Sequence, residues 1–178
     1  MSLPSAAEAC TQALTAAGFG DDDRLCIAVS GGPDSLALLL FAHDLLGGRV
    51  LAATVDHGLR ADSAGEADAV AALCAARTVP HAILRLEWPE GLPGGNVQAQ
   101  ARERRYVALA DWCRAQGVGW LATAHHLDDQ AETLVMRLAR GSGVAGLAGI
   151  RPVRELSGGV RLVRPLLAVR RAALVEIA

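Results

Sequence analysis

The sequence predicts a doubly wound α/β domain, with a mostly parallel five-stranded sheet and helices on both faces. Short apolar segments alternate along the chain with longer helix-like segments. Parallel strands joined by helices form right-handed crossovers, which place helices on both faces of a sheet. The length of 178 residues suits a single domain with a substantial core. Because 52% of the residues are hydrophobic and only 3% are aromatic, we expect that core to be aliphatic.

Local signals place the individual elements. Ser5 and Glu8 form a capping-box pattern before an alanine-rich helix that ends at Gly18. Ser63 and Glu66 form a second capping-box pattern, and Asn96 is expected to cap a later helix. The expected strands cover residues 24–29, 50–55, 82–86, 118–122 and 160–163. The expected helices cover residues 5–18, 35–46, 63–77, 96–116 and 128–140, with a further one from residue 170 onward.

Polar residues gather after the first and fourth expected strands, in SGGPDS (30–35) and AHHLDDQAET (124–133). In the common strand order 3-2-1-4-5, the order reverses between the first and fourth strands. Ligands of doubly wound sheets bind beyond the strand ends at that point. We therefore expect both stretches to face one crevice.

Several protein classes are disfavoured by composition. No apolar run reaches the length of a membrane helix, and the N-terminus lacks the basic segment of a secretory signal, so we expect a cytoplasmic protein without membrane contact. The four cysteines are far apart in sequence and form no CxxC pair. Buried free thiols are therefore expected in place of disulfides or a zinc site.

The basic residues are unevenly distributed, and none of them is a lysine. Residues 1–136 contain 9 arginines against 17 acidic residues, whereas residues 137–178 contain 8 arginines against 2. The basic end has the charge to meet phosphates. An ordinary arginine-rich surface is the alternative.

The stretch VSGGPDSL is built to hold phosphate. Glycines between a strand and a helix let backbone N–H groups approach an anion, and the helix N-terminus adds partial positive charge. The loop lacks the spacing and the lysine of a Walker A motif. Asp34 fits this loop as a ligand of Mg²⁺ carried by the phosphates, or it compensates the helix dipole beside Pro33. The expected ATP-binding residues are Ser30, Gly31, Gly32, Pro33, Asp34 and Ser35.

This loop resembles the pyrophosphatase loop (PP-loop) of the N-type ATP pyrophosphatases. Four further stretches, taken together, resemble the tRNA(Ile)-lysidine synthetase family over roughly residues 22–178. They are VDHGLRADS (55–63), ARERRY (101–106), TAHHLDDQAETLVMRLARGSGVAGLAGI (123–150) and RPLL (164–167). The resemblance implies the Rossmann-like PP-loop ATPase fold.

The family joins free L-lysine to the wobble cytidine of the isoleucine tRNA with anticodon CAU. The resemblance therefore implies a ligase that uses ATP and Mg²⁺. ATP adenylates O2 of the cytosine and releases pyrophosphate; the lysine amine then attacks, and AMP leaves. The product is lysidine.

Candidate residues for the first step are Asp34, His125 and Arg105. His125, at a strand end, could bind phosphate or metal-bound water, whereas helix capping is its alternative role; His126 is the weaker candidate. Arg102 and Arg105 share a helix face, and Arg105 matches the second arginine of the family's ARxxRY pattern. A solvated arginine is the alternative for each.

Asp129 and Glu132 are the candidates for the second step, because they are three residues apart on one helix. Two such carboxylates suit a lysine ammonium group, and one could accept its proton. Dipole compensation at a helix N-terminus is the alternative, and it suits Glu132 poorly.

Weaker candidates follow the second expected strand. Asp56 and His57 could line the nucleotide or cytidine side, and Arg60 could contact phosphate, although a turn built on Asp56 is the alternative. The glycine-rich stretch 141–149 is expected to be a mobile loop over the site, or else a plain connector.

Two rival functions stay open at this stage, a tRNA-thiolating PP-loop enzyme and a nucleotide-binding module without catalysis. The scattered cysteines argue against the first. An ammonia-using synthetase would need an amidotransferase, of which the sequence gives no sign. Family chains normally continue past RPLL into further tRNA-binding parts, so residues 1–178 are expected to be the catalytic domain alone. The sequence does not fix the oligomeric state, and a homodimer stays open.

Overall fold

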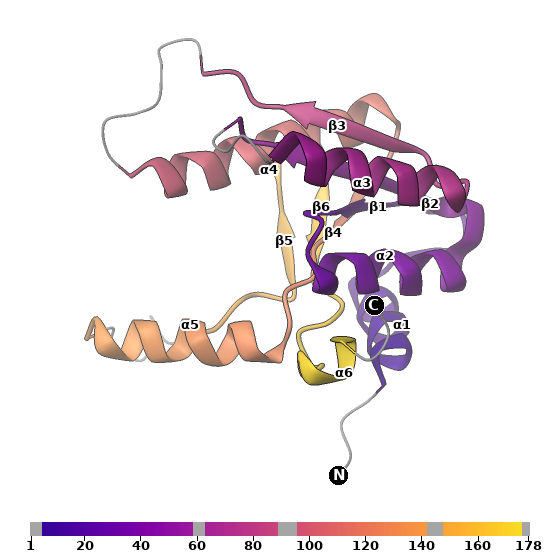
Figure 1. The fold of residues 1–178 in the computed structure, drawn as a ribbon. Helices are drawn as coiled ribbons and strands as arrows, with labels where there is room; N and C mark the ends of the chain where they lie inside the picture. The colour runs from indigo at the N-terminus through magenta and orange to yellow at the C-terminus, as the bar shows by residue number, and fades with distance from the viewer. Residues whose placement is uncertain (1–4, 59–62, 89–95, 142–147, 176–178) are drawn as a thin grey trace.

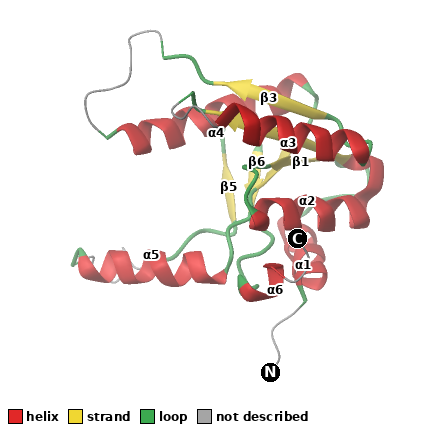
Figure 2. Cartoon of the chain, viewed as in Figure 1, coloured by secondary structure: helices red, strands yellow, loops and turns green. Residues whose placement is uncertain are grey.

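A computed structural model of the chain describes residues 5–58, 63–88, 96–141 and 148–175. Figure 1 shows the ribbon and Figure 2 its secondary structure. The helices are α1 (Ala6–Ala17), α2 (Pro33–Leu46), α3 (Ser63–Ala76), α4 (Val97–Ala115), α5 (Leu127–Ala139) and α6 (Ala172–Val175). The strands are β1 (Leu25–Ala28), β2 (Val50–Asp56), β3 (His81–Arg85), β4 (Trp120–Ala122), β5 (Val153–Glu155) and β6 (Arg161–Val163).

The sheet has the order β3-β2-β1-β4-β6-β5, and all neighbours are parallel except β5 and β6. This confirms the doubly wound architecture and the reversal of strand order between β1 and β4. The expected count of five strands was wrong by one. The missing strand is β5, whose three residues pair antiparallel with β6. A strand that short, between a proline and a turn, has no apolar alternation to reveal it.

Two hydrophobic clusters cover the two faces of the sheet. Successive residues of a strand point to opposite faces, so Ile27 packs with α1, α2 and α3, whereas Cys26 packs with α4. Most of the large side chains that are fully buried are leucines, which confirms the expected aliphatic core. All four cysteines are buried and free, as expected: Cys10, Cys26, Cys74 and Cys113.

The helix ends confirm some of the capping signals. Ser5 and Glu8 form the expected capping box, and Gly18 ends α1 at a φ of 84°. Asn96 precedes α4 but makes no side-chain capping bond, because it adopts a left-handed conformation with φ 54°. The expected N-cap position of Asn96 is therefore confirmed, whereas the side-chain capping bond is not made. The side chain of Ser63 lies outside the described residues.

Helix α5 extends away from the sheet (Figure 1). None of its residues is buried, and Val135 is 64% exposed. Exposed apolar side chains of this kind gather along the second half of the helix, at Leu134, Val135, Met136 and Leu138. Among the described residues, no helix has both the length and the apolar character needed to cross a membrane.

Candidate functional site

The loop between β1 and α2 is held by its own hydroxyl groups. The Ser30 N–H donates to Ser35 Oγ at 3.1 Å, and Ser35 Oγ donates to the Gly32 carbonyl at 2.8 Å. Gly31 has a φ of +85°, which a residue with a side chain rarely adopts. Gly32 is the N-cap of α2 and Pro33 opens the helix, so no side chain caps the first turn. An anion could therefore approach these N–H groups.

Asp34 lies in the first turn of α2 with one oxygen paired and one not. Its Oδ2 lies 3.6 Å from His126 Nε2 and 3.6 Å from Arg171 Nε. Its Oδ1 is buried and has no hydrogen-bond partner. A buried carboxylate oxygen without a partner is costly unless a cation or donor meets it.

This geometry fits an ion shared with phosphates. Within the described ranges, no three His, Cys, Asp or Glu side chains lie close enough to hold a metal by themselves. Mg²⁺ is commonly bound by one or two carboxylates together with substrate phosphates. The free Oδ1 of Asp34 beside the glycine loop has the chemistry for that arrangement.

The loops after β1 and β4 meet, as expected. The contact is made by His126, which is 6% exposed and serves as the N-cap of α5. Its backbone N–H donates to Asp129 Oδ2 at 2.8 Å, and its Nδ1 accepts the Asp129 N–H at 3.4 Å. Thus His126, which the sequence favoured less than His125, is the histidine beside Asp34. The capping bond also gives Asp129 a structural role.

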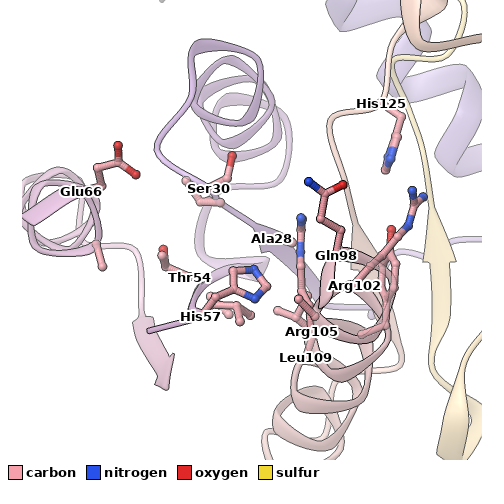
Figure 3. Close-up of a pocket in the computed structure, with 16 residues that line it drawn as sticks. Ala28, Ser30, Thr54, His57, Glu66, Gln98, Arg102, Arg105, Leu109 and His125 are labelled. Atoms are coloured by element: carbon pink, nitrogen blue, oxygen red, sulfur yellow. The ribbon is translucent and has the colours of Figure 1, made fainter. Parts of the chain in front are cut away.

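A cavity of about 480 Å³ opens beside the loop, a size typical of ligand pockets. It lies where β1, β2, α3 and α4 converge with the loop after β4 (Figure 3). The polar groups in its wall are Ser30, Thr54, His57, Glu66, Gln98, Arg102, Arg105, Tyr106 and His125. Its apolar wall includes Val29, Val55 and Leu109. A mixed wall of this kind suits a nucleoside with a charged end.

His125 faces this cavity as a neutral imidazole. Its Nδ1 lies 2.9 Å from Thr123 Oγ1. Burial and, to a smaller extent, the nearby Arg164 lower the pKa of His125 from 6.5 to about 4, whereas Asp129 opposes the shift. At neutral pH the ring therefore offers a hydrogen bond without a charge.

Two arginines of α4 supply the positive charge of the cavity. Arg102 and Arg105 both line it, which confirms that they share a helix face. Burial lowers the pKa of Arg105, and the neighbouring Arg102 lowers it further. Burial and Arg105 likewise lower the pKa of His57. A phosphate group would relieve the repulsion between these cations.

Other candidates lie outside this cavity. Asp56 Oδ1 accepts the Gly58 N–H at 2.9 Å, which is the turn given as its alternative role. Glu132 is exposed on α5. Arg60 lies outside the described residues, as does most of the 141–149 stretch.

Sequence reasoning gave no site role to Glu66 and Gln98. Glu66 was assigned to a capping box, yet it lies in the cavity wall. The sequence did offer one signal for a site role of Glu66, because Glu66 lies in the first turn of a helix that follows a strand end. Gln98 carried no comparable signal, because its position depends on how α4 crosses the sheet.

The site combines a glycine loop at the reversal of strand order, an unpaired carboxylate oxygen beside that loop, and a neighbouring cavity that contains arginines. These features define a nucleotide-binding protein of the doubly wound α/β class. The family comparison agrees. The model of the ATP-binding PP-loop domain matches residues 4–178, and the chain belongs to this family.

Curated relatives are about half identical to this chain over the aligned residues. It is 55% identical over 157 residues to a tRNA(Ile)-lysidine synthase of Novosphingobium aromaticivorans. The aligned region covers 86% of this chain and 47% of the relative. A tRNA(Ile)-lysidine synthase of Zymomonas mobilis is 51% identical with the same coverage. The chain therefore spans about half the length of these relatives.

A solved structure shares the fold. The U34-tRNA thiolase NcsA from Methanococcus maripaludis, solved with its [4Fe-4S] cluster, superimposes with a TM-score of 0.80. The match covers 97% of this chain and 62% of that chain, at 19% sequence identity. At this identity the likeness supports the fold alone.

Proposed function

We propose that residues 1–178 form the catalytic domain of a ligase that converts the wobble cytidine of tRNA(Ile) with anticodon CAU to lysidine. The substrates are ATP, L-lysine and the tRNA. The observation that carries the proposal is the meeting of the phosphate loop with the start of α5, through Asp34 and His126 at 3.6 Å. The names of the curated relatives support the choice of reaction.

In the first step the cytosine O2 attacks the α-phosphate of ATP, and pyrophosphate leaves. Because the Ser30 and Ser35 N–H groups are bonded within the loop, the N–H groups of Gly31, Gly32 and Asp34 are proposed to hold the phosphates. Arg105 stabilises the charge that develops on them. His125 donates or accepts a hydrogen bond as a neutral ring. Asp34 would hold Mg²⁺ through its unpaired Oδ1, and the bound ion would supply charge neutralisation at the phosphates.

In the second step the lysine side-chain amine attacks C2 of the activated cytosine. The C–N bond forms as the C2–O bond to AMP breaks, and the amine loses a proton. Asp129 and Glu132 are proposed to bind the ammonium form and to take that proton. The capping bond of Asp129 uses Oδ2, and the other carboxylate oxygen is not part of that bond. Glu132 is exposed and free to meet a ligand held over α5.

The rival thiolation chemistry is disfavoured by the positions of the cysteines. Such enzymes commonly use catalytic cysteines or iron–sulfur clusters. Here all four thiols are buried, and none lines the cavity. Burial also raises the pKa of Cys26 well above its usual value, which opposes formation of a thiolate.

The first step is tested without lysine. We expect the chain to release pyrophosphate from ATP when the tRNA carries CAU and not when it carries GAU. Release that ignores the anticodon would contradict the proposed substrate. No release, with ATP still bound, would identify a nucleotide-binding module without catalysis.

A further inference from the structure

A second, more open cavity of about 420 Å³ lies beside the first, between α4 and the segment from β5 to residue 157. Arg102 and Tyr106 line both cavities, so the two are neighbours on either side of these side chains. Arg154 of β5 lines only the second. The nucleotide site assigned above does not use this second cavity.

Four arginines gather around Tyr106. The guanidinium carbons of Arg105 and Arg154 each lie 5.9 Å from the centre of its ring. Arg164 lies close enough to Tyr106 for the tyrosine side chain to oppose the lowering of the Arg164 pKa. Burial lowers the pKa of Arg164, and Arg102 and Arg154 lower it further. The cations are thus close enough to repel one another.

Arg164 is the buried member of this group and is only partly satisfied. It is 5% exposed and bonded to the Arg151 carbonyl. Its Nε is buried without a hydrogen-bond partner. A guanidinium in this state lacks the acceptor that its geometry is suited to, an oxyanion.

Two carboxylates lie near these arginines without pairing with them. Glu103 and Glu155 line the second cavity. Nevertheless, in the part of the chain that is described, no ion pair joins Arg102, Arg154 or Arg164 to a carboxylate. An uncompensated arginine cluster beside an open cavity indicates a polyanionic ligand.

We propose that Arg102 and Arg154, with the buried Arg164 behind them, form a second anion site, which takes a backbone phosphate of the RNA next to the reacting nucleotide. The inference rests on the proposed function, because it needs an RNA whose base enters the first cavity. The loop at residues 30–35, on the other side of Arg102, is the site proposed for the phosphates of ATP. A strand that places one base in the first cavity would carry its next phosphates along the second, where backbone contacts fix its register.

The test measures RNA and ATP affinity separately for the 178-residue chain. The RNA probe is a hairpin with the CAU anticodon loop, and its binding is measured by fluorescence anisotropy. ATP binding is measured by calorimetry. Arg154→Gln is the variant, because Arg154 is exposed and its loss threatens the fold least. Arg77→Gln is the matched control, since it removes an exposed arginine at the opposite end of the strands.

We expect Arg154→Gln to weaken RNA binding about tenfold, as the loss of a charged hydrogen bond does. The slope of log affinity against log salt should fall by about 0.7, the value for one phosphate contact with a single strand. ATP affinity should stay unchanged, Arg77→Gln should match the original chain, and Arg154→Lys should be intermediate.

Three other results would overturn the inference, each in a distinct way. An equal loss of ATP affinity would assign the site to the phosphates of the nucleotide. Unchanged RNA affinity would mean that these arginines hold no phosphate. If the original chain binds no RNA, the proposed substrate fails as well. RNA binding that depends on Arg154, without lysine incorporation, would leave this site standing and refute only the proposed reaction.

Discussion

Asp34→Asn separates the proposed metal role from a structural one. The substitution keeps the shape of the side chain and removes its charge. In the fold, Asp34 Oδ2 contacts His126 and Arg171 at 3.6 Å, and Arg171 is 59% exposed. The Arg171 pair is therefore screened by solvent and contributes about 1 kcal/mol or less, whereas the polar asparagine side chain can keep the contact with the buried His126. The negative charge in the first turn of α2 adds a few tenths to 1 kcal/mol of stability. We therefore expect the free energy of unfolding to fall by about 1–2 kcal/mol at most.

The expected effect on adenylation is much larger. Removing a single group that stabilises charge in the transition state commonly slows a reaction by about 10²–10³-fold. Asp34→Asn should therefore reduce pyrophosphate release by at least that factor in the presence of ATP and tRNA. Urea unfolding of the same preparation should show a native fold.

Asp128→Asn is the matched control. Asp128 accepts the Arg171 N–H at 2.8 Å and lies 3.6 Å from His126, so it shares both neighbours of Asp34. It lies outside the phosphate loop, and we expect less than about a threefold effect on release. Release by Asp34→Asn within threefold of the original chain would refute the metal role. Equal losses in both variants would mean that the negative charge near His126 matters, and not the unpaired Oδ1 of Asp34.

Three further predictions address other parts of the account. Glu132→Gln should weaken the use of lysine by about tenfold or more and leave ATP affinity unchanged, because Glu132 lies on α5, outside the cavity; equal loss of both would point to misfolding or a nucleotide role. Because the pKa of His125 falls from 6.5 to about 4 on folding, protonation favours the unfolded chain. The free energy of unfolding that His125 contributes should then be fully present above pH 6.5 and be lost as the pH falls to about 4, by about 3 kcal/mol at most. Urea titrations at several pH values, compared with His125→Gln, check this, and an unchanged pH dependence in the variant would contradict it. Finally, a thiol reagent at pH 8 should label the native chain slowly and all four cysteines after denaturation; rapid labelling of the native chain would show that a thiol is accessible.

The parts of the fold that sequence reasoning predicted are those governed by local patterns. The apolar run before SGGPDS and the glycines after it placed β1, the loop and α2, and the strand order was taken as the order common in doubly wound sheets. The strand β5 was missed because three residues carry no periodic signal, and its pairing depends on the neighbouring β6. The side chain of Asn96 makes no capping bond because the chain enters α4 in a left-handed conformation that composition does not reveal.

The candidate site likewise has one part that local sequence patterns predicted and one part that they did not. Ser30, Arg102, Arg105 and His125 came together in one cavity because each follows a strand end or lies on one helix face. The partners of Asp34 could not be derived, since Arg171 reaches it from a segment more than a hundred residues away. Likewise the burial of Arg164 beside Tyr106 depends on tertiary packing that a lone RPLL motif does not encode.

The central claim is that this chain joins lysine to a tRNA. The most direct measurement is ATP-dependent incorporation of labelled L-lysine into an isoleucine tRNA transcript with anticodon CAU, with the 178-residue chain as the sole protein. We predict incorporation that requires ATP and is absent when the anticodon is GAU. Pyrophosphate release without any lysine in the tRNA, or incorporation that ignores the anticodon, would contradict the claim.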